Sequence, residues 1–349
     1  MIAHPTGEFR NEKYRPQFHF TPDRNWMNDP NGLVYYKGKY HLFFQHNPQA
    51  NVWGNMSWGH ATSADLYNWQ EEPVAIACTP TSGIFSGSAV VDINNTSGFG
   101  TTDNPPIVAI YTEHQNDESN QSQCLAFSVD EGATFTKYEG NPVLDINAKN
   151  FRDPKVQWID NQWIMTVALA NDFKISFFSS SDLKSWTHLS NFGPAAEVGG
   201  VWECPDLIQF DDKWVLLVSL NPGGYQVGSG TQYFIGQWNG KEFIADDLQT
   251  RWLDYGRDNY AGVTFSNAPE GKKIFLGWMS NWHYAGKVPT DPWRSTMTLP
   301  RELSLQGDRI IQTPVIHPNG FPEVSFTTQE GAIRICESNE RYVEIGVRN

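Results

Sequence analysis

The feature that most constrains the fold is a β-rich pattern that recurs about every 50 to 70 residues. Helical periodicity is nearly absent, and short aromatic or aliphatic runs alternate with turns rich in Gly, Asn, Asp and Pro. Five segments share this pattern, each with a polar turn followed by an apolar run: residues 34–44, 104–111, 158–167, 209–219 and 268–278. The pattern predicts an all-β chain.

A second, shorter repeat supports a modular chain. Residues 63–69, 128–135 and 180–186 each contain a Ser, an Asp two positions later, and a terminal aromatic residue. One four-stranded blade cannot bury both of its faces alone, so a repeated all-β unit of this size is typical of a β-propeller. We therefore predict a five-bladed β-propeller, with a β-sandwich or jelly roll as the alternative.

The ends of the chain differ from the repeating part. We predict an N-terminal extension at residues 1–14, a catalytic propeller at 15–310, and a linker at 311–323, where Pro and Gly accumulate. Residues 324–349 alternate like strands but are too few for a stable domain. They are expected to begin a C-terminal β-sandwich module that this chain does not complete.

Composition narrows the function. The 39 acidic and 25 basic residues give a formal charge of −14, which argues against nucleic acid or anionic membranes as partners. The chain holds 14 Trp, and exposed Trp is a common platform for sugar rings. Its four Cys are widely spaced, and no His cluster has metal-ligand spacing, so no metal or cofactor is expected. No apolar run approaches about 18 residues, so no membrane-spanning segment is expected. Residues 1–20 are polar, so no signal peptide is expected in this chain.

Three acidic residues lie in unusual surroundings, in different repeats. Asp29, Asp153 and Glu203 each have apolar or aromatic neighbours and precede a Pro by one or two positions. Asp29, within Trp26-Met-Asn-Asp-Pro-Asn-Gly32, is expected in a loop. Any one of them alone fits an ordinary turn or ion-pair carboxylate. A propeller gathers its repeats around one axis, so three at this spacing indicate a shared site.

The neighbours suggest different roles. Trp202 and Pro205 should desolvate Glu203 and raise the pKa of its carboxyl, as a general acid requires. Arg152 should keep the adjacent Asp153 ionised, which suits it to accept hydrogen bonds from substrate hydroxyls. One protonated carboxyl beside two ionised ones is the arrangement of a glycosidase.

Four motifs resemble, in order and spacing, those of glycoside hydrolase family 32, which includes invertases, levanases and inulinases. They are Trp26-Met-Asn-Asp-Pro-Asn-Gly32, Phe85-Ser-Gly-Ser88, Arg152-Asp-Pro154 and Trp202-Glu-Cys-Pro205. The resemblance covers residues 14 to 320 and extends to the strings Trp58-Gly-His-Ala61, Asn221-Pro-Gly-Gly224 and Pro292-Trp-Arg-Ser295.

The resemblance implies a propeller followed by a β-sandwich, and retaining cleavage of β-fructofuranosidic bonds without a metal or cofactor. It makes Asp29 the nucleophile, Glu203 the acid/base and Asp153 the stabiliser of the transition state. The fructose pocket would be lined by Trp26, Asn28, Gln45, Trp53, Phe85, Ser86, Arg152 and Trp282. Gln45 and Ser86 also fit hydrogen-bonded strand residues, and Trp53 and Trp282 also fit core packing.

The expected substrate is a fructan or fructo-oligosaccharide, from which the enzyme releases the terminal unit. We expect the protein to act outside the cell, at the cell surface or in the periplasm, and the cytoplasm stays an alternative. The alternatives are a fructosyltransferase with the same site and a non-catalytic carbohydrate-binding propeller. A third alternative is an inverting arabinan or xylan hydrolase, but the motif from Trp26 to Gly32 argues against it. The sequence does not choose among levan, inulin and sucrose, and it does not predict an oligomeric state.

Overall fold

The computed structural model describes residues 12–315 and the short stretches 325–329, 332–336 and 342–346. The chain divides into two compact units, Met1–Pro314 and Val315–Asn349, which we describe separately. Within the described residues no helix is long and apolar enough to cross a membrane.

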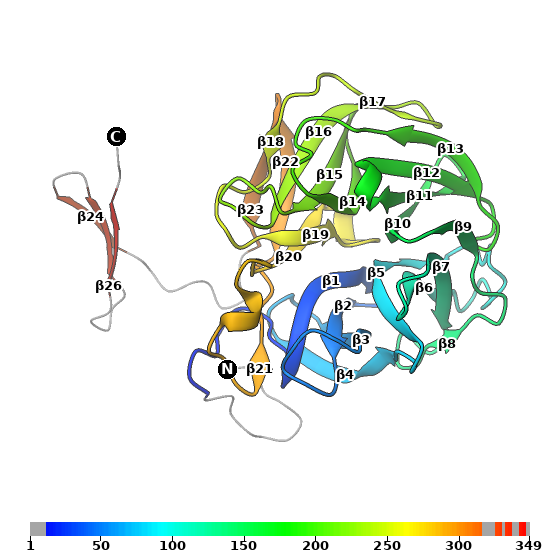
Figure 1. Cartoon of the computed structure of the whole chain (residues 1–349), viewed down its shortest axis with the longest axis horizontal. Coiled ribbons are helices and arrows are strands. Elements are labelled where there is room, and N and C mark those ends of the chain that lie inside the picture. Colours follow the sequence, from blue (N-terminus) through cyan, green and yellow to red (C-terminus); the bar gives the residue numbers. More distant parts are fainter. Residues whose placement is uncertain (1–11, 316–324, 330–331, 337–341, 347–349) are drawn as a thin grey trace. The chain divides into compact units, whose positions relative to one another are not determined.

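The larger unit is a five-bladed β-propeller, so the predicted fold class is confirmed (Figure 1). Each blade is an antiparallel sheet whose first strand is innermost. The first blade comprises β1 (Asn25–Tyr36), β2 (Lys39–Asn47), β3 (Ser57–Ser63) and β4 (Trp69–Ile76), and the second β5 (Ser82–Val91), β6 (Ile107–Gln115), β7 (Gln121–Ser128), β8 (Thr136–Lys137) and β9 (Leu144–Ala148). The third comprises β10 (Phe151–Ile159), β11 (Gln162–Leu169), β12 (Lys174–Ser180) and β13 (Thr187–Phe192).

The last two blades follow the same plan. The fourth comprises β14 (Val201–Phe210), β15 (Lys213–Asn221), β16 (Gly230–Trp238), β17 (Phe243–Ala245) and β18 (Arg251–Trp252), and the fifth β19 (Tyr260–Thr264), β20 (Ile274–Trp278), β22 (Arg301–Gln306) and β23 (Arg309–Pro314). Short 3-10 turns occur at η1 (Ala170–Asp172), η2 (Pro269–Gly271) and η3 (Ala285–Lys287). The ring closes where β21 (Trp293–Arg294) pairs in parallel with the start of β1.

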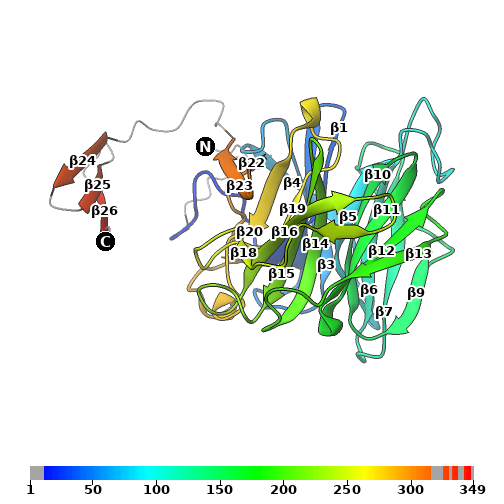
Figure 2. The same cartoon turned by 90° about the horizontal axis from the view of Figure 1, so that it is seen from above.

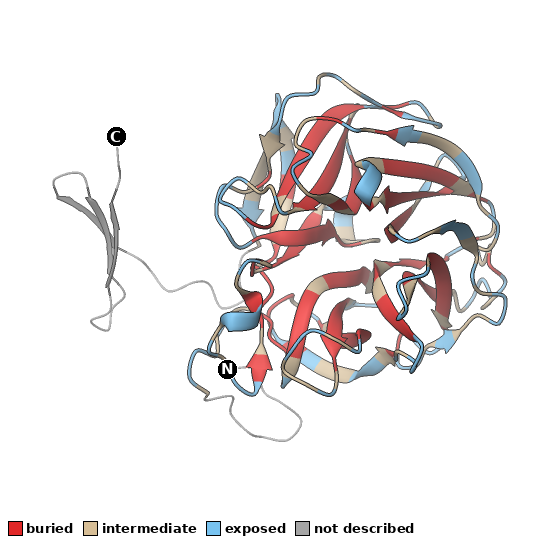
Figure 3. Cartoon of the chain, viewed as in Figure 1, coloured by how far each residue is buried: buried red, intermediate tan, exposed pale blue. Residues whose placement is uncertain are grey.

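The core lies between neighbouring blades, and Figure 2 shows these stacked sheets from the side. Trp58 and Tyr111 pack between the first two blades, while Phe177 and Trp202 pack between the third and fourth. Each blade is therefore covered on both faces by its neighbours in the ring, which explains why the inner strands are buried almost along their whole length (Figure 3). The second strands are covered in the same way, which explains why β11 and β15 have apolar runs in place of alternating patterns.

The two sequence repeats have clear structural counterparts. Four of the five predicted segments span or border the hairpin between the first two strands of a blade, whereas 104–111 falls at the end of the loop from β5 to β6. The Ser-x-Asp repeat forms the turn between the third and fourth strands of the first three blades. In that turn the Ser63 hydroxyl accepts from the Asp65 amide at 3.1 Å, and Ser180 and Asp182 make the same contact.

The smaller unit contains one antiparallel three-stranded sheet, formed by β24 (Ser325–Gln329), β25 (Ala332–Cys336) and β26 (Tyr342–Gly346). The predicted β-sandwich and the predicted domain boundaries stay predictions. The segment predicted as a linker, 311–323, overlaps β23, and its residues 316–323 lie outside the described residues, as do residues 1–11 of the predicted extension.

Candidate active site

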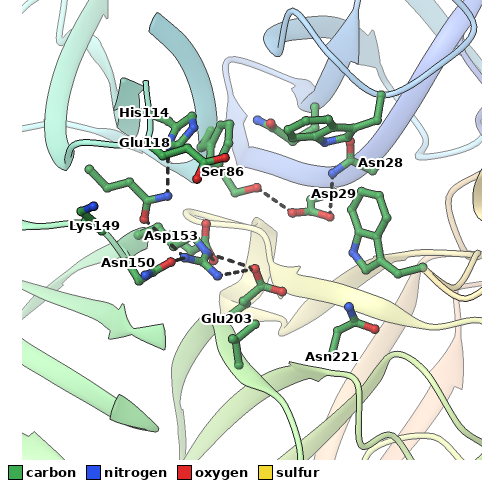
Figure 4. A pocket seen from close by; sticks show the side chains of 17 residues that line it. Asn28, Asp29, Ser86, His114, Glu118, Lys149, Asn150, Asp153, Glu203 and Asn221 are labelled. Carbon is green, nitrogen blue, oxygen red and sulfur yellow. Dashed lines mark hydrogen bonds and ion pairs between the residues drawn. The ribbon is translucent and has the colours of Figure 1, made fainter. Parts of the chain in front are cut away.

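A cavity of about 510 Å³ lies where the inner strands of the propeller begin (Figure 4). Every blade contributes to its wall or to the contacts just behind it. The lining residues are Asn28, Asp29, Gln45, Trp53, Phe85, Ser86, His114, Glu118, Gln121, Lys149, Asn150, Arg152, Asp153, Val201, Glu203, Asn221 and Trp282.

All three predicted catalytic carboxyls line this cavity, as do seven of the eight predicted pocket residues. Trp26 is the exception, because its buried indole lies one layer behind the wall. It stacks on Trp282 with ring centroids 5.9 Å apart, and its Nε1 donates to Asn28 Oδ1 at 2.8 Å. Trp26 therefore supports two lining residues instead of lining the cavity itself.

The inner strands present their polar side chains to the cavity through β-bulges. The strand register shifts at the same level in all five blades, next to Asp29, Ser86, Asp153, Glu203 and Tyr260. A bulge bends a strand and redirects a side chain, and bulges are frequent beside active sites. The five bulges thus surround the propeller axis at the end where the cavity lies.

Asp29 is part of strand β1, so the expectation that it lies in a loop is wrong. The turn-forming residues around it produce bulges within the strand, since Pro30 has no amide proton to pair. Gly32 allows the chain to continue here, because it has a φ of 54° and a Cβ at this position would lie 2.6 Å from the Phe43 ring.

The Asp29 carboxylate is bound on both oxygens. Ser86 Oγ donates to Oδ2 at 2.7 Å, and Asn28 Nδ2 donates to Oδ1 at 3.0 Å. Burial and then the nearby Glu203 carboxylate raise the pKa of Asp29 to about 6, against the two hydrogen bonds, which lower it. At neutral pH the group is mostly ionised and fixed in one orientation, as a nucleophile requires.

Asp153 differs from the sequence-based expectation. Arg152 was expected to keep it ionised, but the guanidinium lies 4.0 Å from Asp153 Oδ2 and only 3.0 Å from Glu203 Oε1. Burial is the largest influence, and with the Glu203 charge it raises the pKa of Asp153 to about 7. The Asp153 carboxyl accepts from the Cys204 amide at 3.1 Å, and its own amide donates to Thr112 Oγ1 at 3.0 Å.

Glu203 lies across the cavity from Asp29, and its side chain is 20% exposed (Figure 4). Arg152 donates to Oε1 at 3.0 Å, and the buried Tyr260 hydroxyl donates to Oε2. Trp202 was expected to desolvate Glu203, but successive strand residues face opposite sides, and the Trp202 indole is buried in the core between two blades.

A free, buried thiol lies between two of the three carboxyls. Cys204 Sγ lies 3.8 Å from Asp29 Oδ2 and 3.6 Å from Asp153 Oδ2. Burial raises the pKa of this thiol well above its usual value, so it stays protonated. Two acidic side chains thus meet at one neutral group, which belongs to the residue that follows Glu203 in the sequence.

Three aromatic rings, those of Trp53, Phe85 and His114, form another part of the cavity wall. Phe85 stacks on His114 with ring centroids 4.4 Å apart, and Trp53, which is 51% exposed, packs edge-on against Phe85. Gln45 is fixed behind them, since its Nε2 donates to Asn31 Oδ1 and to Ile84 O. Such a mixture of ring faces and fixed polar groups suits a neutral polyhydroxylated ligand.

Sequence reasoning missed several residues of the site: His114, Glu118, Gln121, Lys149, Asn150, Val201 and Asn221 on the wall, and Tyr260 behind Glu203. Asn150 and Val201 have a signal, because Asn150 lies three positions before Asp153 and Val201 lies two positions before Glu203. The hairpin that carries His114 and Glu118 contains no motif. In the part of the chain that the structure describes, no group of three or more His, Cys, Asp or Glu side chains could hold a metal ion.

The sequence matches a known protein family and several characterised relatives. The family model for the glycosyl hydrolases family 32 N-terminal domain matches residues 19–314. A levanase of Bacillus subtilis is 49% identical over 88% of this chain and 48% of its own length. An extracellular exo-inulinase of Aspergillus ficuum is 44% identical over 84% of this chain and 63% of its own length.

Solved structures agree with these matches. The crystal structure of an exo-inulinase from Aspergillus awamori is 39% identical, with a TM-score of 0.85 over 94% of this chain and 72% of that one. A β-fructofuranosidase from Schwanniomyces occidentalis, complexed with fructosyl-erythritol, is 45% identical, with a TM-score of 0.82 over 90% of this chain and 64% of that one. The chain thus spans roughly half to two thirds of the length of the curated relatives named above.

Proposed function

Since the chain belongs to glycosyl hydrolase family 32, we propose that it is a retaining β-fructofuranosidase that releases terminal fructose from fructans, fructo-oligosaccharides or sucrose. The observation that carries this proposal is the meeting of Asp29 and Glu203 across one cavity, with Asp153 beside them. The names of the relatives, a levanase and an exo-inulinase, support fructans as the substrate class.

In the first step Asp29 attacks the anomeric carbon of the terminal fructosyl unit. Its orientation is set by Ser86 and Asn28, and its ionised form dominates at neutral pH. Glu203, whose side chain is 20% exposed, gives its proton to the departing oxygen. The C–O bond to the leaving group breaks as the bond to Asp29 forms, which leaves a covalent fructosyl-enzyme.

In the second step Glu203, now a carboxylate, removes a proton from water, which attacks the anomeric carbon and releases Asp29. Arg152 and Tyr260 hold the Glu203 carboxyl in one orientation, because both donate to its oxygens. Two inversions give net retention of configuration. Asp153 accepts hydrogen bonds from the fructosyl hydroxyls and, when ionised, stabilises positive charge at the transition state.

One assay tests the proposal most directly. The protein is incubated with levan, inulin and sucrose, and the initial rates and product lengths are compared. Fructose as the main product supports exo-acting hydrolysis, whereas lengthened oligomers at high sucrose indicate the transferase. No release of fructose from any of the three would contradict the proposal.

The acid role of Glu203 has its own test. Glu203→Ala should lose most activity on sucrose but keep the first step with β-fructosyl fluoride, since fluoride departs without a proton. An equal loss on both substrates in the rate of the first step, measured for the fluoride as the initial burst of fluoride release, would assign Glu203 another role. We also propose that the protein acts outside the cytoplasm, because a relative is an extracellular enzyme, and fractionation of the producing cells tests this.

A further inference from the structure

Two exposed tyrosines form an aromatic pair on the fourth blade and the segment that follows it. Tyr225 is 55% exposed and Tyr255 is 62% exposed, and their ring centroids lie 5.0 Å apart in an edge-to-face arrangement. The half-buried Trp252 lies behind Tyr225, with a centroid separation of 6.3 Å. Core packing does not explain rings that are more than half exposed, and exposed aromatic clusters mark binding surfaces.

The pair lies at the cavity end of the propeller. Strand β15 ends at Asn221, which lines the cavity opposite Val201, and Tyr225 follows in the next loop. The segment that carries Tyr255 ends at Tyr260, whose hydroxyl touches Glu203. Both loops therefore leave from the wall of the cavity, at the same end of the blades.

One buried side chain joins this pair to the cavity wall. The Nδ2 of Asn281 donates to the carbonyls of Val227 and Arg257, one in each of the two loops. Gly228 makes room for it, because a Cβ there would lie 2.1 Å from Asn281 Oδ1. The next residue, Trp282, lines the cavity, and its amide donates to Ser229 Oγ at 3.1 Å. The rings and the wall are thus preorganised as one unit.

We propose that Tyr225 and Tyr255 form a platform for further sugar units of a fructan chain whose terminal fructosyl unit occupies the cavity. This inference rests on the proposed function. A cavity of about 510 Å³ is small for a polymer, so the rest of the chain must continue over the surface. Tyrosine rings offer flat faces to the C–H groups of neutral sugars at a low cost in side-chain entropy.

The kinetic test compares long and short substrates. Tyr225→Ala, Tyr255→Ala and the double variant are assayed on polymeric levan and inulin and on sucrose. We expect the double variant to lose about tenfold in kcat/KM on at least one of the two polymers, with sucrose within about twofold, because sucrose does not reach the platform. Tyr→Phe at both positions should keep the polymer activity, since the ring supplies the contact.

The matched control is Trp158→Ala. Trp158 is also exposed, at 40%, but it lies near the far end of β10, whose first residues are at the cavity. Its loss should leave the polymer-to-sucrose ratio unchanged. An equal loss on polymer and sucrose in the tyrosine variants, or no loss on either polymer, would overturn the proposal.

A binding measurement separates this proposal from the proposed function. Wild type and the double Tyr→Ala variant migrate through native gels that contain levan or inulin. Retardation of the wild type, lost in the variant, supports the platform even if the wild type releases no fructose. The platform would be overturned, irrespective of turnover, if the wild type is not retarded in either gel. It would also be overturned if, in both gels, the double variant is retarded as strongly as the wild type.

Discussion

Two groups of buried ionisable residues lie on the same inner strands of the propeller, a few residues apart. At the cavity, Asp29, Asp153 and Glu203 bring three acidic groups around one guanidinium, Arg152. Deeper along the strands, Lys155 follows Asp153 by two positions, and Asp206 follows Glu203 by three. There the Lys155 ammonium lies 3.6 Å from Asp206 Oδ2, which also accepts from the amide and hydroxyl of Thr264 at 2.7 Å.

The deeper group is balanced in charge and satisfied in hydrogen bonds, whereas the cavity group is not. Burial of carboxylates and then the like charges around them raise the free energy of the folded state, and the raised pKa values of Asp29 and Asp153 report that cost. A fold has no need of such an arrangement, so the cavity group is explained by chemistry and the deeper group by stability. The predictions below test this contrast.

The largest expected effect is on activity at the cavity. Asp29→Ala and Glu203→Ala should each lower kcat on sucrose roughly 10⁴-fold, because each removes a group that, in the proposed mechanism, bonds to or protonates the substrate. Thermal stability should not fall, since neither side chain contributes to the core and Asp29→Ala also removes a buried charge. Glu118→Ala, a carboxylate in the same cavity, is the control and should cost less than about tenfold. Near wild-type activity in either catalytic variant would remove its assigned role.

The next effect is on stability in the deeper group. Asp206→Asn keeps an acceptor for Thr264 but leaves the buried Lys155 ammonium without a carboxylate. We expect a loss of about 3 kcal/mol in the free energy of unfolding, measured by denaturant titration, with kcat per folded molecule unchanged. Asp246→Asn, which breaks the exposed pair with Lys213, is the matched control and should change little. Equal stability of the two variants would contradict the contrast.

A smaller effect has the opposite sign. The folded pKa of Asp153, about 7, is above its unfolded value, so its ionisation destabilises the fold as pH rises from about 4 through about 7. Asp153→Asn removes this cost. The variant should therefore gain stability relative to wild type on going from pH 4 to pH 8, on the order of 1–3 kcal/mol. A pH-independent difference between the two unfolding curves would argue against a raised pKa.

The smallest expected effect is on the acidic limb of the pH profile of kcat/KM. Because Asp29 must be ionised to attack and its pKa is about 6, kcat/KM on sucrose should fall about tenfold per pH unit below about 6. Ser86→Ala removes a hydrogen bond that lowers this pKa, so the limb should move to higher pH. A limb that moves to lower pH in Ser86→Ala would show that another group controls it.

Sequence reasoning found the fold and most of the site for identifiable reasons. The repeat length identified the propeller, and the prolines after Asp29, Asp153 and Cys204 marked the inner strands where the pairing is interrupted. The same prolines suggested a loop at Asp29, because a bulge and a turn use the same residue types. Tyr260 was missed since its contact with Glu203 joins positions 57 residues apart and no local pattern indicates it.

The sequence by itself determined which residues are available at each blade: an acidic residue in the first, third and fourth, set among apolar neighbours and prolines. Only the tertiary structure decided their partners. Arg152 is adjacent to Asp153 in sequence but binds Glu203, because the bulge at Asp153 and the approach of β14 bring the Glu203 carboxyl closer to the guanidinium. Sequence neighbours predict the charges of a site, whereas distances in the folded chain decide which charges interact and shift each other's pKa.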